Sequence, residues 1–162
     1  MEQISKLVYK FSKYVLIFLV VIMTIVIVAQ VICRTFFGFS IFWAEELSRY
    51  CLTWVTFVGA SMALRNADLV ALDLIEKKMK GQWKWFLQLF IEILVFVFIL
   101  IAIVYGLKQA FSPSIINQVS PALRLPMPIV YISIPVGFTF MLIHSIRSCF
   151  QLVKSRKENT EW

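Results

Sequence analysis

Long uncharged apolar runs, separated by short polar segments, dominate the pattern of the chain. Charged residues divide the chain into four mainly apolar segments, which predict helices over residues 14–33, 41–64, 85–107 and 125–146. A helix rises about 1.5 Å per residue, so about 20 residues cross a hydrocarbon core of about 30 Å. In lipid each segment must satisfy its own backbone N–H and C=O groups, which favours helices. The pattern therefore predicts an all-α integral membrane protein with four transmembrane helices.

The second predicted helix is the least regular of the four. Its uncharged part, residues 50–64, is short, and the preceding residues 41–49 carry charges but no helix breaker. We expect a single helix whose polar start lies near or in the membrane interface. The connecting segments 65–84 and 108–124 are too short to build a globular domain. The whole chain, 1–162, is therefore predicted to be one membrane domain.

The loop after the second helix carries an amphipathic pattern of its own. Leu69, Leu72, Ile75 and Met79 recur at helical spacing, with charged residues between them. This spacing predicts a short amphipathic helix that lies in the membrane interface and ends at Gly81.

Proline residues mark the start and the middle of the fourth helix. Pro126 and Pro128 suit a first helical turn, where a missing N–H costs little. Pro135 lies inside the predicted helix and predicts a kink there.

Basic residues are distributed unevenly about the predicted helices. Twelve of the 16 Lys and Arg residues fall in the N-terminal tail, the 65–84 loop and the C-terminal region. Because cytoplasmic loops of membrane proteins carry an excess of Lys and Arg, both termini are predicted to be cytoplasmic. Topology and attraction to anionic lipid account for the net charge of +7, so no nucleic-acid binding is expected.

Composition narrows the class of protein further. Residues of the set AVILMFWYC make up 60% of the chain, charged residues make up 15%, and the mean hydropathy is +0.84. Soluble proteins average about 45–50% apolar and about 25% charged residues. A soluble domain of 162 residues cannot bury this much apolar surface, which excludes a soluble enzyme. We expect no catalytic site, no metal site and no cofactor.

One face of the helix over 41–64 gathers polar and small side chains. At about 100° per residue, six residues fall within about 60° of Arg49. They are Glu45, Glu46, Thr53, Thr56, Ala60 and Ala63. The two glutamates precede Arg49 at ion-pair spacing. Small residues let another helix approach closely, so the face serves either packing within the bundle or docking onto another protein.

Two isolated residues inside predicted spans are further candidates. Glu92 is the only charged residue in its run, and a carboxylate inside a span is expected to face protein or water. It serves either as a structural contact or in proton or ion coupling. His144 shares a helical face with Ser133, Gly137 and Ser148, which favours helix packing or an interfacial position over a functional role.

Several stretches of the chain resemble a known family. They are the run 43–50, Trp54, the runs 57–60, 63–65 and 69–73, the pair 125–126, Tyr131, Pro135 and Gly137. Together they look like the signature of the small membrane subunit (the DctQ-like or Q subunit) of tripartite ATP-independent periplasmic (TRAP) transporters. The resemblance covers roughly residues 40–140 and extends to the length and the four-span layout.

The resemblance implies an accessory role in a bacterial inner membrane. The small subunit would pair with a large multi-span permease subunit that carries the substrate and sodium sites. A periplasmic substrate-binding protein would deliver an organic acid such as a C4-dicarboxylate or sialic acid. The small subunit would extend the fixed scaffold of this sodium-coupled transporter, in contact with membrane lipid, and would not bind substrate.

A second hypothesis comes from the residues alone. Glu92 could act as the carrier in a self-sufficient small proton-coupled transporter or channel. In that case homo-oligomers of the chain would conduct without any partner.

Overall fold

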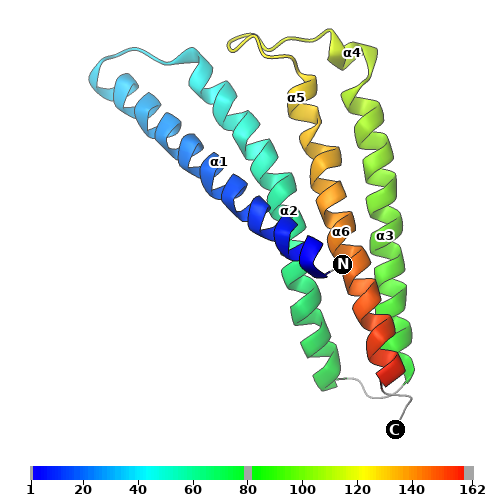
Figure 1. Ribbon diagram of the computed structural model, residues 1–162. Coiled ribbons are helices and arrows are strands. Elements are labelled where there is room, and N and C mark those ends of the chain that lie inside the picture. The colour runs from blue at the N-terminus through cyan, green and yellow to red at the C-terminus, as the bar shows by residue number, and fades with distance from the viewer. Residues whose placement is uncertain (1, 79–81, 159–162) are drawn as a thin grey trace.

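The computed structural model describes the backbone of residues 2–78 and 82–158 and the side chains of residues 3–66 and 86–150. The described chain is helical apart from its connecting loops and one isolated β-bridge, which confirms the all-α class (Figure 1). The helices are α1 Glu2–Phe36, α2 Phe42–Lys78, α3 Gln82–Ala110, α4 Pro113–Ile116, α5 Pro128–Tyr131 and α6 Ser133–Glu158.

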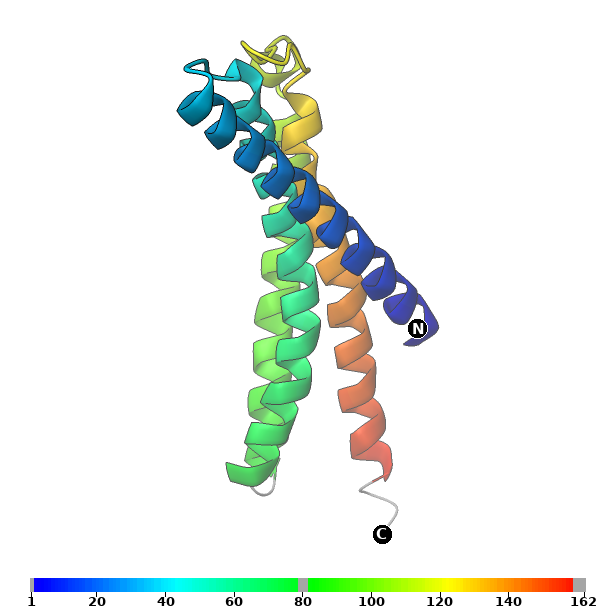
Figure 2. The same ribbon diagram turned by 90° about the vertical axis from the view of Figure 1, so that its left-hand side faces the viewer.

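The four long helices pack in the order α1, α2, α6, α3. Helix α2 contacts α1 on one side and α6 on the other, and α3 contacts α6. Figures 1 and 2 show α1 crossing α2 obliquely, so that its C-terminal half diverges from the rest of the bundle. The loop from Phe37 to Ile41 spans this separation, and Gly38 takes a φ of 70° there, which glycine adopts without strain.

Three helices are long and apolar enough to cross a membrane within the described residues. They are Gln3–Phe36, Phe86–Ala110 and Pro128–Phe150. Helix α2 is long enough but not apolar enough to count among them, because charged and hydroxyl side chains interrupt its apolar run. Three candidate spans are thus found, while the fourth crossing and the cytoplasmic position of the termini stay predictions.

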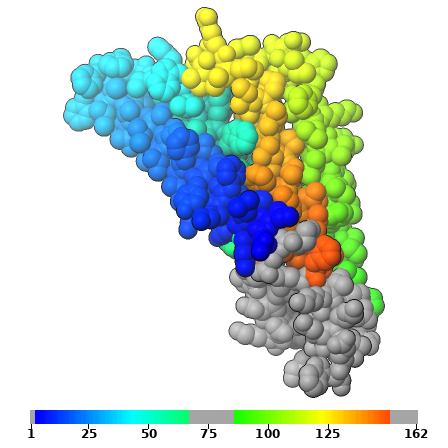
Figure 3. Space-filling view, in the orientation of Figure 1, coloured from blue at the N-terminus to red at the C-terminus, as the bar shows by residue number. Residues whose placement is uncertain are grey.

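Most large apolar side chains of the described helices point outward. The most apolar 18-residue window of α1 contains no buried residue. In the space-filling view α1 lies as an outer layer across the front of α2 (Figure 3). An apolar exterior of this kind requires lipid or another membrane protein around it.

The segment after residue 64 differs from the prediction. A separate amphipathic helix was expected over residues 69–79, but α2 continues without a break to Lys78. The reason is local: residues 65–78 hold good helix formers such as Ala, Leu, Glu and Lys and no Gly or Pro. Met79 and Gly81, the predicted end, lie outside the described residues.

The start of the fourth predicted helix is also different. Pro126 forms a β-bridge with Val119 and precedes the helix, which begins at Pro128. A kink was predicted at Pro135; in the structure the helix is interrupted just before it, because α5 ends at Tyr131 and α6 begins at Ser133. Pro135 has no N–H to donate to the carbonyl of Tyr131, four residues earlier.

Of the described glycines, Gly137 on α6 leaves the least room for a side chain, at the point where α6 crosses α2. A Cβ atom added to Gly137 would lie 2.6 Å from Cβ of Phe57 and 2.7 Å from its carbonyl oxygen. The neighbouring rings of Phe57 and Phe138 are 6.0 Å apart, and Phe138 also contacts Phe98 of α3 at 5.8 Å. Helix α6 is therefore the central helix that holds α2 and α3 together.

Candidate functional site

Two polar clusters lie toward opposite ends of the bundle. The first, which we call the loop cluster, joins the start of α2 to the loop before α5 and comprises Glu45, Glu46, Arg49 and residues 120–125. The second, which we call the three-helix cluster, lies where α1, α2 and α6 meet. It comprises Ser5, Tyr9, Arg65, His144 and Arg147.

Glu46 organises the loop cluster. Its Oε2 atom accepts hydrogen bonds from the backbone N–H groups of Leu123 (2.8 Å) and Ala122 (3.1 Å). It also accepts one from the hydroxyl of Ser120 (3.1 Å). The N–H of Ser120 in turn donates to the carbonyl of Leu125 at 3.0 Å, which closes the loop. One carboxylate of α2 thereby holds the turn that leads into α5.

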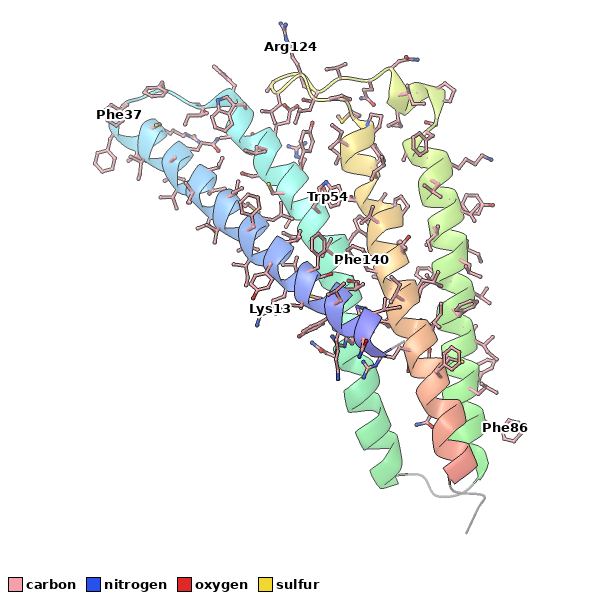
Figure 4. All side chains as sticks on the ribbon, in the orientation of Figure 1. Lys13, Phe37, Trp54, Phe86, Arg124 and Phe140 are labelled. Carbon is pink, nitrogen blue, oxygen red and sulfur yellow. The ribbon has the colours of Figure 1, made fainter. Side chains whose placement is uncertain are left out.

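Arg124 stands at the end of this turn. It has a φ of 51°, in the left-handed region that residues other than glycine rarely adopt. Its side chain points away from the protein at the tip of the loop (Figure 4). The three bonds to Glu46 constrain the backbone on its N-terminal side.

These contacts set the protonation of Glu46, which lies outside the three candidate spans. Partial removal from water raises its pKa, but hydrogen bonds from the loop and from Tyr50 outweigh this effect. The pKa of Glu46 therefore lies below its ordinary value of 4.5.

We expect the order of the loop to depend on the charge of Glu46. Because its pKa is lowered in the folded protein, the stabilisation is present above pH 4.5 and is lost as the pH falls through the lowered value. Amide hydrogen exchange over residues 120–125, corrected for the intrinsic rates, measures this order. The protection should fall in acid in the wild type, and in Glu46→Gln it should be lower and independent of pH. Glu45→Gln, which alters the adjacent carboxylate, should behave as wild type; equal protection in all three proteins would contradict the expectation.

The predicted ion pair at the start of α2 is confirmed in part. Arg49 Nη2 lies 2.8 Å from Glu45 Oε1, with the two side chains 68% and 74% exposed. A pair this exposed contributes only about 0–1 kcal/mol. Glu46, expected beside Arg49 as well, is instead bound to the loop.

The rest of this α2 face presents small side chains. The hydroxyls of Thr53 and Thr56 donate to backbone carbonyls one turn earlier, at 2.9 and 2.8 Å. Because these hydroxyls are bonded to the backbone, the threonines present their methyl groups and make the surface flat and apolar. Thr56 and Ala63 are exposed and Ala60 is half-buried. We call Arg49, Thr53, Thr56, Ala60 and Ala63 the small-residue face.

Glu92 contacts a neighbouring helix. Its Oε2 accepts a hydrogen bond from the hydroxyl of Ser145 on α6, at 3.3 Å. The two residues line a pocket of about 320 Å³ with apolar neighbours such as Phe96 and Phe150. Gln88, one turn earlier, is buried. The geometry supplies a structural contact between α3 and α6.

His144 is deeply buried in the three-helix cluster. Its side chain is 1% exposed, and a hydrogen bond of 2.8 Å joins Nδ1 to the hydroxyl of Ser5 on α1. The face that it shares with Ser133, Gly137 and Ser148 is buried throughout, as expected for helix packing.

Four members of the three-helix cluster were not among the predicted site residues: Ser5, Tyr9, Arg65 and Arg147. The two arginines were counted as topology signals, and Arg65 also as part of the stretch that resembles the family. Ser5 and Ser12 lie seven residues apart on an otherwise basic and apolar stretch, and this heptad spacing was a usable sequence signal. In the structure both serines are fully buried. Among the described residues, no group of three or more His, Cys, Asp or Glu side chains is placed to hold a metal ion.

Comparison with known proteins identifies the family. Residues 23–155 match the family of tripartite ATP-independent periplasmic transporters, DctQ component. This match spans most of the chain, so the chain belongs to the DctQ family, the small subunits of TRAP transporters. Members of this family are components of transport systems. Together with the apolar helices, the assignment makes the chain a multi-pass protein of the inner membrane.

Individual relatives are remote in sequence. The sialic acid TRAP transporter permease protein SiaT of Haemophilus influenzae is 30% identical over 83 residues, covering 51% of this chain and 14% of SiaT. The isethionate TRAP transporter permease protein DctMQ of Oleidesulfovibrio alaskensis is 22% identical over 65% of this chain and 16% of its own length. The ectoine TRAP transporter small permease protein TeaB of Halomonas elongata is 26% identical, over 94% of this chain and 77% of TeaB. The chain thus spans only a small part of the first two relatives and most of the third.

Proposed function

We propose that the chain is the accessory scaffold subunit of a sodium-coupled secondary transporter. It works with a large multi-span permease subunit and a periplasmic substrate-binding protein. The observation that carries the proposal is the matching stretch in SiaT, which makes up 14% of a much longer polypeptide named as a permease. A segment homologous to this chain is there covalently joined to a permease, so a separate chain of this type fits the same position without the covalent link.

The geometry supports a structural role over a chemical one. Hydrogen bonds between residues far apart in the sequence order a loop through Glu46 and join helices through Glu92 and His144. The small-residue face of α2 and the apolar sides of α1 and α3 are open in the described chain. We propose that the small-residue face docks against the large permease subunit and that much of the remaining apolar surface contacts lipid.

The transported solute is proposed only at the level of its class. Sialic acid, isethionate and ectoine stand in the names of three relatives with comparable similarity to this chain. A small subunit of one family thus occurs with chemically different solutes, which supports the idea that specificity resides in the other chains. We propose that an organic acid of the sialic acid or C4-dicarboxylate type is taken up with sodium, and that this chain does not contact it.

Omission of the chain tests the proposal. Proteoliposomes that contain the chain, its permease and the binding protein should take up the organic acid when a sodium gradient is applied. Without the chain, uptake should fall to the background of empty vesicles, because the fixed part of the permease loses its lateral support. Full uptake by the permease without this chain would contradict the proposal, and so would flux through vesicles that contain this chain alone.

A further inference from the structure

Five exposed aromatic rings occupy the connection between α1 and α2, residues 36–43, which we call the aromatic loop. Their side chains are between 45% and 86% exposed: Phe36, Phe37, Phe39, Phe42 and Trp43. The ring centroids of Phe37 and Phe39 lie 6.1 Å apart, and Figure 4 shows Phe37 at the outer edge of the protein, away from α3 and α6. The chain holds no charged residue between Arg34 and Glu45. A surface of this composition requires an apolar environment.

The backbone of the aromatic loop has the opposite requirement. The N–H of Phe37 donates to the carbonyl of Cys33 at 3.0 Å. The next bond along the chain joins the N–H of Ala44 to the carbonyl of Ile41 at 3.1 Å. Between these two bonds, the N–H groups of residues 38–41 donate to no atom of the described chain. Hydrocarbon offers them no acceptor, so this backbone needs water or the polar part of the lipid headgroups.

The other loop at the same end of the bundle is built differently. Glu46, near the start of α2, holds residues 120–123 through its carboxylate, so the two loops lie at one end (Figure 1). In this second loop the N–H groups of Ser120 and Arg124 donate to loop carbonyls at 3.0 and 3.1 Å. It is polar and closes its own hydrogen bonds, as suits a loop in water. The aromatic loop is apolar and leaves its backbone open.

We propose that the aromatic loop anchors the chain in the interface of the bilayer. Its rings lie where the acyl chains begin, and its backbone lies among the headgroups, so both requirements are met at one depth. Aromatic side chains of membrane proteins gather at this level. The rings continue the apolar exterior of α1, where Val28, Val31 and Ile32 are also exposed. Arg34, exposed in the last turn of α1, supplies a cation to the lipid phosphates.

The anchor also fixes the inclination of α1. With 35 residues α1 is about 52 Å long, whereas the hydrocarbon core is about 30 Å thick. A helix that is too long for the bilayer fits by tilting, and Figures 1 and 2 show α1 inclined to α2. Rings at the interface hold the C-terminal end of α1 at one depth, so the helix keeps its tilt.

Fluorescence quenching of Trp43 in phosphatidylcholine vesicles tests the proposal. The full chain carries Trp43 as its only tryptophan, and phenylalanine replaces the others. Lipid nitroxides near the headgroup end of the acyl chain should quench Trp43 about twofold more than nitroxides near its methyl end. The matched control combines Trp43→Phe with Ala122→Trp, which places the ring on an exposed position of the polar loop. Acrylamide in the water should quench this control severalfold more than Trp43.

Removal of two rings tests the anchor itself. Phe37→Ser together with Phe39→Ser should move Trp43 toward water, so acrylamide quenching should rise about twofold and lipid quenching should fall. Phe111→Ser is the control, because it removes an exposed ring just after α3, outside the aromatic loop. It should leave the quenching of Trp43 unchanged. Unchanged quenching after the loss of both Phe37 and Phe39 would overturn the anchor.

The remaining outcomes separate the alternatives. Acrylamide quenching of Trp43 equal to that of the Ala122→Trp control would assign the aromatic loop to water and overturn the proposal. Strongest quenching by the methyl-end nitroxides would assign it to the acyl region and overturn the interfacial depth. Loss of lipid quenching on addition of the permease would assign the rings to that protein and overturn the lipid contact.

Footprinting of the wild-type chain decides if the tryptophan variants do not fold. Hydroxyl radicals generated in the water on both sides of the vesicles modify aromatic rings that water reaches. Phe37 and Phe39 should react severalfold more slowly in the vesicles than in the chain unfolded in urea. Equal rates in the two states would overturn the proposal.

Discussion

Replacing Gly137 with alanine should destabilise the bundle more than the same substitution at Gly59 or Gly106. The new Cβ atom would lie 2.6 Å from Cβ of Phe57 and 2.7 and 2.8 Å from its carbonyl oxygen and carbon. Two of these three atoms are backbone of α2, which cannot turn aside as a flexible side chain can. Overpacking of this kind costs about 1–3 kcal/mol, and here α2 and α6 must separate along their length to relieve it.

The other helix glycines provide a graded control. A Cβ on Gly106 would lie 3.0 Å from a side-chain methyl, Cγ2 of Ile134, and not against backbone at that distance, so Gly106→Ala should have an intermediate effect. A Cβ on Gly59 would lie 3.8 Å from Leu16, an ordinary contact. Gly59→Ala should be neutral or stabilising by up to about 1 kcal/mol, because alanine favours the helix.

Thermal unfolding of the three purified variants in detergent measures the series. The midpoint should fall strongly for Gly137→Ala, slightly for Gly106→Ala and not for Gly59→Ala. Because α6 is the central helix, Gly137→Ala should also lower the amount of folded chain recovered from membranes. A midpoint for Gly137→Ala equal to that of Gly59→Ala would contradict the close approach of α2 and α6.

The helices were predictable because apolar runs and charge gaps are local properties of the sequence. The ends of the helices were less predictable. The continuation of α2 to Lys78 follows from the absence of Gly and Pro, but an amphipathic pattern favoured a separate element. The position of Pro126 before the helix depends on its pairing with Val119, which is a contact between residues of a folded loop. The crossing at Gly137 depends on a distant partner, Phe57, that the pattern of either helix does not specify.

The polar contacts also divide into a local one that the sequence predicts and distant ones that it does not. The Glu45–Arg49 pair lies within one helix turn and follows from spacing. The partners of Glu46, His144 and Glu92 lie on other elements, far away in the sequence. Spacing along one helix cannot reveal them. It was possible to predict which residues were unusual for a membrane span, but not what each contacts.

Replacing Thr56 with tryptophan should separate the chain from its permease without unfolding it. Thr56 is exposed in the middle of the small-residue face, which in our proposal approaches a helix of the large subunit closely. A bulky ring there would hold the two helices apart, because close approach of membrane helices depends on small side chains. We expect the amount of permease that purifies with the chain to fall about tenfold, and uptake to fall with it.

Val104→Trp is the matched control for this substitution. Val104 lies on the outer side of α3 and is 61% exposed, where a larger apolar side chain meets lipid at no steric cost. It should leave association and uptake at the wild-type level, and both variants should keep the thermal midpoint of the isolated chain. If Val104→Trp loses the permease while Thr56→Trp retains it, the docking surface lies on α3 and the proposed face is wrong.

Arg49→Ala examines the polar end of the same face. In the isolated chain its pair with Glu45 is exposed, so the substitution should change stability by about 1 kcal/mol or less. Docking would take the pair out of water, and removal of one partner would then leave Glu45 buried and unpaired, which costs far more than an exposed pair contributes. Association with the permease and uptake should therefore fall although the chain itself stays folded. Unchanged association in Arg49→Ala would show that this end of the face stays in water.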